Sequence, residues 1–444
     1  MLRKNVHFKK NYKKALGMNI LITGAGGFIG SHIAHTLAKS GHMVTGCVRR
    51  KPATGSGNIR YIICDFAADT KPESWQARLE GIDIVINVVG IITESGPNTF
   101  KRVHVEATQA LFDACKEACI KHVIHISALG VCETAKTAYN ITKLAADTYL
   151  QNLKIPYTIL RPSWLYGQRS PSFEVLCAFA ALPLIPVVDK GQYKVQPLWV
   201  TDFATGVSAL VKQGPQNTIL DVGGPEQFPI KEVLSQFRHW LGLRKAPILP
   251  VPASLTRHIV KLGDVLFKGP INSASFDMLT RHNITESVLF WQKTGIQPQT
   301  LPQTLAQNPV QRSDTFYARL FFVLPLLRYS LAFMWIASAL IPALFIPKSV
   351  LLDLFAEVHI TGRIADITLW GALGVDFILG VALLSGRYVR LTCMLQMGII
   401  ALYTVALSLF APHWWLHPYG PVLKNIPILI ATWAVLAAGR AKHV

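Results

Sequence analysis

Charged side chains are scarce in this 444-residue chain, where they make up 16% of all residues, against about 25% in an average soluble protein. The deficit is uneven: residues 320–439 are sparsely charged, whereas the earlier part has the composition of a soluble protein. The length suffices for two or three domains. We therefore predict a soluble part followed by a membrane part.

Cysteines are few and scattered. The odd total of seven, without regular spacing, argues against a disulfide framework and favours a reducing compartment. Cys115 and Cys119 lie one helical turn apart, but no second pair of ligands follows. We therefore expect no metal site.

Acidic residues are absent from residues 1–17, and the whole chain has a net charge of +19. We predict that this segment is a disordered basic arm before a fold that begins at Met18, which is also a possible translation start. Such an arm can contact anionic lipid head groups. It lacks the apolar core of a secretory signal, and no nucleic-acid-binding module accompanies it, so we expect no nucleic-acid partner. Its basic residues are Arg3, Lys4, Lys9, Lys10, Lys13 and Lys14.

Short apolar runs alternate with helical stretches between residues 18 and 160. This alternation predicts an α/β Rossmann-type fold, a doubly wound parallel sheet with helices on both faces. The expected strands are 18–24, 43–48, 59–64, 82–88, 122–127 and 156–160, and helices are expected after the first strand to about residue 37 and at 72–79, 99–119 and 139–153.

The sequence GAGGFIG, residues 24–30, stands between the first strand and the first helix. Gly24 permits a tight turn, Gly27 lets the backbone approach a pyrophosphate, and Gly30 lets the helix pack on the strand. The helix N-terminus adds free N–H groups and the positive end of its dipole. This context favours a dinucleotide-binding loop over a merely structural turn. Its predicted cofactor-binding residues are Gly24, Gly26, Gly27, Phe28, Ile29 and Gly30.

Arg49 and Arg50 follow the second strand, where an NAD site usually places an acid for the ribose hydroxyls. Because a guanidinium group suits a 2′-phosphate, we predict NADP(H) rather than NAD(H), although one arginine can be solvated surface. Asp65, after the third strand, is expected to accept a hydrogen bond from the adenine amine. The fourth strand ends in NVVG, and we expect Asn87, Val89 and Gly90 to pass the cofactor.

Tyr139 and Lys143 share one helix face at a spacing of four residues. An ammonium group beside a phenol lowers the pKa of the phenol, so the tyrosine could exchange a proton with a substrate oxygen near neutral pH. Lys143 can also bind the nicotinamide ribose, and Ser127 ends the fifth strand where its hydroxyl could hold a substrate carbonyl. We predict that Ser127, Tyr139 and Lys143 are catalytic. The alternative is that the tyrosine packs, the lysine is surface and the serine caps a loop.

The motifs of residues 18–205 resemble the short-chain dehydrogenase/reductase superfamily in its extended or atypical branch. They are GAGGFIG, ICDF, NVVG, VHVEAT at 103–108, HISALG at 125–130, YNITK at 139–143, ILRPSWLYG at 159–167 and PLWVTDFA at 197–204. The resemblance implies the same catalytic triad and adds Pro162 to the cofactor-binding residues. His104 stands where the family usually has an asparagine, and Ala107 where glycine is common. His104 either relays protons or packs, and we expect it to pack.

The resemblance narrows further along the chain. FDMLTRHNI, near residues 276–284, and GIQPQTLPQTL are similar to the nucleotide-binding accessory subunit of respiratory complex I and its bacterial relatives. We expect residues 18–165 to form the NAD(P)-binding domain, 166–305 the substrate-side part of the same domain, and the Gln- and Pro-rich residues 306–319 a linker.

Four apolar segments follow, at residues 329–347, 367–386, 391–411 and 425–439, and the last is short for a span of about 20 residues. HWWLHPY at 413–419 is typical of an interfacial aromatic belt, and residues 348–359 of an amphipathic surface helix. We predict that residues 320–444 form an all-α bundle of four transmembrane helices in the inner or cytoplasmic membrane. Both termini and the dinucleotide domain then face the cytoplasm, because arginine and lysine concentrate on that side. The cytoplasmic cations would be Arg312, Arg319, Arg387, Arg390, Arg440 and Lys442, against Lys348, Arg363 and Lys424 outside.

This segment resembles the DoxX-like membrane family, on WIASAL and GVDFILG. That family includes proteins linked to quinone-dependent sulfur oxidation. Charged side chains within a membrane are candidates for a function. Five charged residues are expected at or within the membrane here: Arg328, Glu357, Arg363, Asp366 and Asp376. The simpler expectation is an internal ion pair of Asp376 with Arg328 or Arg363.

Three functional hypotheses follow from this organisation. The leading one is a membrane-tethered NAD(P)-dependent oxidoreductase whose substrate is an apolar carbonyl or alcohol, quinone-, isoprenoid- or lipid-like. The second is a non-catalytic NADPH-binding assembly or stability factor of a respiratory membrane complex. The third, a nucleotide-sugar epimerase or dehydratase, lacks an identified nucleotide-diphosphate subsite.

Overall fold

The computed structural model describes residues 17–52, 58–134, 137–168, 170–266, 276, 280 and 283–439. The predicted basic arm, except Gly17, and most of FDMLTRHNI lie outside these residues, as do Arg440 and Lys442. The chain divides into two compact units, Met1–Ala318 and Arg319–Val444.

A seven-stranded sheet forms the centre of the first unit, with the order β11-β6-β5-β4-β1-β2-β3 and every pair parallel. The chain runs outward from β1 in one direction to β3, then crosses back to β4 and continues in the other direction. This is the doubly wound arrangement that the sequence predicts. The strands are β1 Asn19–Thr23, β2 Met43–Val48, β3 Ile59–Ile63, β4 Ile84–Asn87, β5 His122–Ile126, β6 Tyr157–Pro162 and β11 Thr218–Val222.

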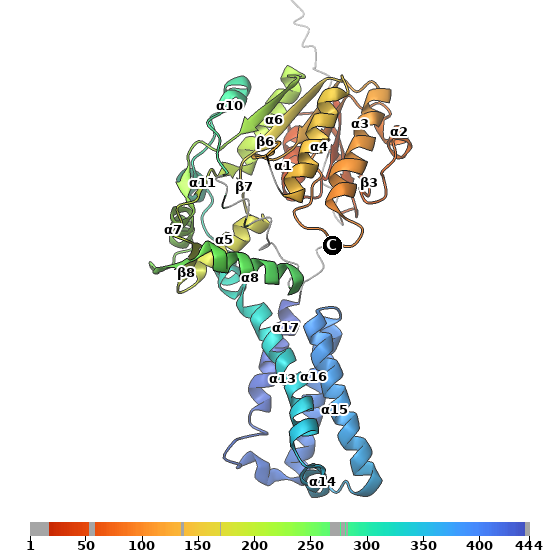
Figure 1. Cartoon of the computed structure of the whole chain (residues 1–444), viewed down its shortest axis with the longest axis vertical. Helices are drawn as coiled ribbons and strands as arrows, with labels where there is room; N and C mark the ends of the chain where they lie inside the picture. The colour runs from red at the N-terminus through yellow and green to blue at the C-terminus, as the bar shows by residue number, and fades with distance from the viewer. Residues whose placement is uncertain are drawn as a thin grey trace, which may run out of the picture. The chain divides into compact units, whose positions relative to one another are not determined.

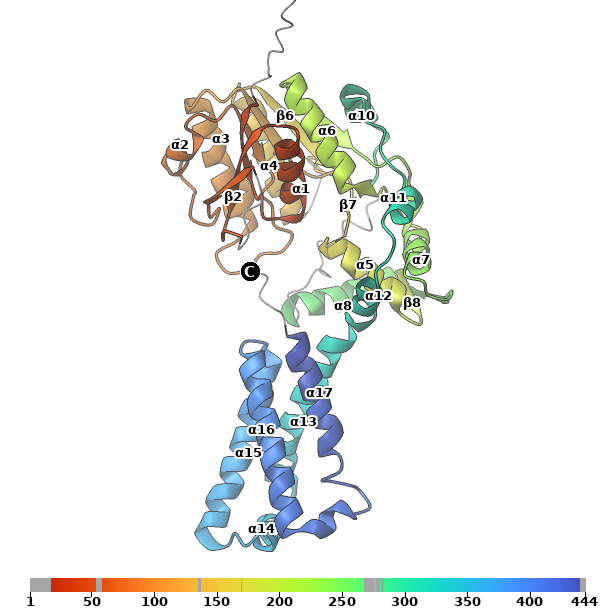
Figure 2. The ribbon, with the colours of Figure 1, turned by 180° about the vertical axis from the view of Figure 1, so that it is seen from behind.

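Helices cover both faces of this sheet because its strands are apolar on both sides. Ile20 and Ile22 of β1 point to one face, where α1 and α6 pack, and Leu21 points to the other, where α2, α3 and α4 pack. Figure 1 shows α3 and α4 side by side on one face, and Figure 2 shows α1 and α6 on the opposite face. The helices are α1 Phe28–Lys39, α2 Glu73–Leu79, α3 Ala107–Glu117, preceded by the π-helix η1 Lys101–Glu106, α4 Ala138–Asn152 and α6 Val200–Gln213.

A smaller subdomain follows β6. Its core joins Tyr166, Phe173, Val233 and Phe237, and its strands pair only two by two: β10 with β7, β12 with β9 and β13 with β8. Its elements are β7 Leu165–Tyr166, α5 Pro171–Ala181, β8 Ile185–Val188, β9 Lys194–Val195, β10 Leu198–Trp199, β12 Phe228–Pro229, α7 Ile230–Trp240, β13 Ile248–Val251 and α8 Ala253–Leu266. Helix α10 (Leu289–Thr294) returns to the sheet part, where it packs on α6 and β11.

The segment 306–319, predicted to be a linker, is largely helical. It contains the end of α11 (Leu301–Gln307) and most of α12 (Arg312–Leu320). Glutamine and proline suggested a loop, but Pro302 lies in the first turn of α11, where proline is tolerated. Thr300 and Gln303 form a reciprocal capping box that starts this helix. Leu301 is buried in the subdomain core, so α11 belongs to the first unit.

The second unit is a bundle of four helices. α13 (Val323–Phe345) packs on α15 (Gly362–Ser385) and α17 (Asn425–Ala438), and α16 (Val389–Phe410) packs on α15 and α17. The short helices α14 (Lys348–Glu357) and η2 (Pro412–Trp415) complete the unit. Among the described residues, three helices are long and apolar enough to cross a membrane, within Arg312–Phe345, Gly362–Ser385 and Val389–Phe410, whereas α17 has 14 residues. The predicted fold class is confirmed: a Rossmann-type unit followed by a helical bundle.

Candidate active site

The glycine loop between β1 and α1 is shaped by backbone contacts that exclude side chains. Gly24 has φ of +67°, a conformation that favours glycine, and its carbonyl accepts a hydrogen bond of 2.9 Å from the N–H of Gly27. A Cβ on Gly30 would overlap that same carbonyl. Helix α1 begins at Phe28, and Gly27 offers no side chain to cap it. No side chain therefore caps the first N–H groups of the helix, as the binding of a pyrophosphate at this end would require.

The end of β4 lies directly beside this loop. Val89 is the residue that a Cβ on Gly24 would meet, at 3.2 Å, and Gly90 is exposed. Strands β1 and β4 are neighbours from which the chain winds in opposite directions. Ligands of doubly wound sheets bind at this point, beyond the carboxyl ends of the strands. The backbone of the glycine loop and of Val89 and Gly90 is therefore brought together as predicted.

Arg49 and Arg50 are both exposed directly after β2. Asp65 lies two residues after β3 and is exposed. One of its carboxylate oxygens accepts a hydrogen bond of 3.0 Å from the N–H of Ala67 in the same turn. These side chains lie at the ends of neighbouring strands and are free to face the adenosine part of a dinucleotide.

Two predicted cofactor residues turn their polar groups inward instead. Asn87 is fully buried; its side-chain oxygen accepts a hydrogen bond of 2.6 Å from Thr23, and its amide nitrogen lies 3.1 Å from Nδ1 of His125. The carbonyl of Pro162 accepts a hydrogen bond of 3.0 Å from the N–H of Leu129. Both residues support the strand ends, and neither offers these groups to a cofactor.

Tyr139 and Lys143 stand on the first turns of α4, whose N-cap is Thr137. The ammonium of Lys143 donates a hydrogen bond of 3.0 Å to the carbonyl of Ile126 at the end of β5. A Cβ on Gly90 would come within 3.2 Å of Lys143 Nζ, so the missing side chain keeps room around the ammonium. The tyrosine and the lysine are thus held at the carboxyl edge of the sheet, beside the end of β4.

The expected lowering of the Tyr139 pKa is wrong for this structure. Burial, followed by the negative charge of Asp147, raises the pKa of the phenol to about 12. Burial also lowers the pKa of Lys143 to about 8, although the carboxylate of Asp147 opposes that change. The loss of hydration therefore outweighs the attraction between an ammonium and a phenolate.

Ser127 is buried, and its hydroxyl donates a hydrogen bond of 2.9 Å to Oδ2 of Asp147. Arg161 donates to the same oxygen from Nε at 3.0 Å and from Nη2 at 2.8 Å. The hydroxyl hydrogen of Ser127 is therefore occupied within the protein, and the prediction that it holds a substrate carbonyl is not supported by this geometry.

The site predicted from the sequence did not include the ion pair of Asp147 and Arg161. Asp147 lies four residues after Lys143 and eight after Tyr139, on the same face of α4. That spacing is the sequence signal that could have revealed it. The pair fixes the Ser127 hydroxyl, and its negative charge acts on both Tyr139 and Lys143.

His104 lies in the π-helix η1, an irregularity that often marks functional sites. Its Nε2 accepts a hydrogen bond of 3.0 Å from the N–H of Ile91, and its Nδ1 lies 3.0 Å from the hydroxyl of Thr142. The ring packs edge-to-face on Tyr139. Both ring nitrogens are thus engaged, which supports packing rather than proton relay.

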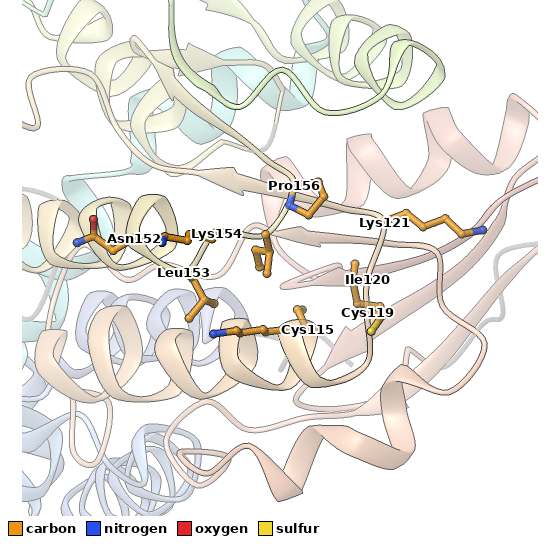
Figure 3. Close-up of a pocket in the computed structure, with 10 residues that line it drawn as sticks. Cys115, Cys119, Ile120, Lys121, Asn152, Leu153, Lys154 and Pro156 are labelled. Carbon is orange, nitrogen blue, oxygen red and sulfur yellow. The ribbon is translucent and has the colours of Figure 1, made fainter.

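A surface pocket of about 720 Å³ lies at the other edge of the sheet. Figure 3 shows it between the end of α3, with Cys115 and Cys119, and the turn from α4 to β6, with Leu153 and Pro156. These residues precede β5 and β6, so the pocket opens at the amino ends of the strands. It is separate from the site that Tyr139 and the glycine loop form.

Comparison with known families agrees with this geometry. Residues 20–223 match the model of the NAD dependent epimerase/dehydratase family, and residues 332–433 match that of the DoxX-like family. The chain thus carries, one after the other, a region that matches the model of each of these two families. The DoxX-like domain and the three long apolar helices indicate a membrane protein.

Similar proteins differ in their described activities. A mitochondrial "NADH dehydrogenase [ubiquinone] 1 alpha subcomplex subunit 9" of Arabidopsis thaliana is 24% identical over 52% of this chain, and the match spans 61% of that relative, less than two thirds of its length. A ceramide reductase of Caulobacter vibrioides is 25% identical over 53% of this chain and 75% of its own. The solved structure of a nucleoside-diphosphate-sugar epimerase from Staphylococcus aureus shares the fold, with a TM-score of 0.53 and 22% identity over 65% of this chain and 99% of its own.

Proposed function

We propose that this chain is an NAD(P)-dependent oxidoreductase that acts at a membrane on an apolar carbonyl or alcohol, such as a quinone, isoprenoid or lipid. The observation that carries the proposal is the Tyr139–Lys143 pair beside Gly90 and the glycine loop. The apolar helices of the second unit support a substrate from the bilayer. The resemblance to a protein named ceramide reductase supports a lipid-like substrate.

A bound nicotinamide cofactor would supply or accept the hydride. The glycine loop and the N-terminus of α1 would hold its pyrophosphate, and Lys143, already held by the carbonyl of Ile126, would present its remaining donors to the ribose. Tyr139 is the side chain that can exchange a proton with the substrate oxygen. Because its pKa is raised to about 12, the phenol holds its proton at neutral pH and can donate it to a carbonyl oxygen.

Turnover tests this proposal. We expect NADPH or NADH oxidation by the purified full chain with a panel of quinones and lipid ketones, and a fall in kcat of about 100-fold or more in Tyr139→Phe, because the proton donor is lost. Tyr149→Phe is a matched control on the same helix, since that hydroxyl donates to Asp113. Equal turnover by Tyr139→Phe and the unchanged protein would overturn the assignment of Tyr139.

A second candidate is a non-catalytic NADPH-binding assembly or stability factor of a respiratory membrane complex. The engagement of Ser127 with Asp147 favours it, because the hydroxyl is then unavailable to a substrate. The relative named as a subunit of NADH dehydrogenase points the same way. In that case the cofactor would stabilise the fold without reacting. Co-purification of stoichiometric, unreacted cofactor with a partner complex would support it, and turnover by the isolated chain would exclude it.

A further inference from the structure

The core of the helical bundle contains buried polar groups that have no hydrogen-bond partner within the residues that the structure describes. Gln396 on α16 is 0% exposed, and neither its amide nitrogen nor its oxygen has a hydrogen-bond partner among the described residues. Trp335 on α13 is 4% exposed, and its indole N–H likewise has no partner there. Both side chains belong to helices long and apolar enough to span a membrane.

These two side chains lie in the same part of the bundle. Cys393, one turn before Gln396, packs with Leu331 and Leu383. Ile400, one turn after Gln396, packs in one apolar cluster with Trp335 itself. Gln396 therefore sits between two apolar clusters in the middle of the bundle, and Trp335 belongs to the second of them.

A third orphaned group comes from α15. Asp376 lies one turn from Leu379, which packs in the cluster of Trp335 and Ile400, and its Oδ1 is buried without a partner in the described part of the chain. The expected ion pair with Arg328 or Arg363 is not found among the described residues. Arg328 instead donates a hydrogen bond of 2.8 Å to the hydroxyl of Tyr329, its neighbour.

Such an arrangement is costly unless something satisfies it. A buried amide or indole N–H without a partner in an apolar environment destabilises the fold relative to one that is hydrogen-bonded. Buried polar groups in native proteins are satisfied by protein, water or ligand. Polar side chains within a membrane commonly mark a functional site.

We propose that the centre of the bundle, between α13, α15 and α16, binds the polar end of an apolar ligand that carries a carbonyl or hydroxyl oxygen. Trp335 can only donate a hydrogen bond, and so requires an acceptor oxygen. Gln396 can both donate and accept, and Asp376 offers an acceptor when ionised and a donor when protonated. A quinone head and the hydroxyl and amide groups of a ceramide present this chemistry, and the apolar surroundings suit their tails.

Binding can be measured without any cofactor, so this proposal stands or fails separately from the proposed reductase activity. The detergent-purified full chain is titrated in separate arms with decyl-benzoquinone and with N-hexanoyl ceramide, and its thermal unfolding is followed. We expect a saturable rise in Tm with at least one probe. Trp335→Phe, which removes the N–H and keeps an aromatic ring, and Gln396→Leu should each weaken that binding by about tenfold, the loss of one good hydrogen bond.

Matched controls lie on the exposed faces of the same helices. Trp370→Phe on α15 also removes an indole N–H, and Met394→Leu lies two residues before Gln396; both positions are exposed, and both variants should bind like the unchanged protein. The absence of a saturable shift with either probe would overturn the proposal. It would also be overturned if Trp335→Phe and Gln396→Leu both bound the probe as tightly as the unchanged protein. A Gln396→Leu variant that is more stable and binds the probe unchanged would overturn it too, because it would indicate that only water occupies the site.

Discussion

Burial rather than a neighbouring charge determines the acidity of Tyr139. The four-residue spacing to Lys143 is visible in the sequence, but the pKa of the phenol depends on how much water the fold removes and on Asp147. The residue therefore has the position expected of a proton donor and a pKa opposite to the expected one. The environment of the phenol, and not the motif, therefore sets its pKa.

Arg49 and Arg50 allow a test of cofactor choice. Changing both to serine should weaken NADPH binding by about tenfold or more, because charge-assisted contacts to a 2′-phosphate are lost, and should leave NADH binding nearly unchanged. Isothermal titration measures both affinities. Arg244→Ser with Lys245→Ser removes the same charge from an exposed pair and is the control. A parallel fall in both affinities would show that the arginines do not select the 2′-phosphate.

His104 predicts an acid sensitivity. Burial, followed by the charge of Lys143, lowers its pKa to about 3, while the unfolded chain has a histidine pKa of about 6.5. Between these values the unfolded state binds the extra proton, so stability falls as pH falls from about 6.5 to 3. At pH 5 the loss is about 2 kcal/mol.

The variant His104→Asn should remove this part of the acid sensitivity. Thermal unfolding of the detergent-purified chain at pH 7.5 and pH 5 measures it, and the difference between the two pH values should be smaller in the variant. His122, whose pKa burial lowers to about 4, and His125, whose pKa burial lowers well below its usual value, remain in both proteins and contribute the residual sensitivity. An unchanged difference would show that His104 is not held neutral in the folded protein.

At the scale of elements, the turn from β1 to α1 is the place where a single residue type affects both the fold and the predicted cofactor binding. Gly30 is the position where the helix crosses closest to the strand end, so Gly30→Ala must displace either the helix or the loop. We expect a loss of stability of about 1–3 kcal/mol, as for other overpacked sites, together with loss of cofactor binding. Chemical denaturation and NAD(P)H titration measure the two effects. Gly263→Ala in α8, where a Cβ meets nothing within 4 Å, should be neutral or stabilising.

Helices α11 and α12 show how composition can mislead about an element. Glutamine and proline predict irregular chain on average, yet a proline in the first turn and a capping box at Thr300 start a helix. The contact of Leu301 with the subdomain core then stabilises it. Position within the element, and not composition, decided its structure.

At the scale of the whole molecule, the number of membrane spans is the open prediction. Three helices have sufficient length and α17 has 14 residues, so a fourth span requires additional residues before Asn425. A fluorescent reporter fused at the C-terminus should be active on the cytoplasmic side if α17 crosses, and the same reporter placed after Tyr419 should not. If both fusions report the same side, α17 does not cross and the four-span prediction is wrong.

The order of strands and helices, the glycine loop and the spacing of Tyr139 and Lys143 follow from the sequence itself, because periodicity, turn chemistry and helix geometry are local. The membrane unit follows equally from the length and composition of its apolar segments. Only the tertiary structure decided that Ser127 donates to Asp147, that Asn87 is turned toward His125, and that Gln396 is buried without a partner in the described part of the chain. Each depends on which distant segments the packing brings together, and a hydrogen-bond partner or the absence of one is not encoded in any short stretch of chain.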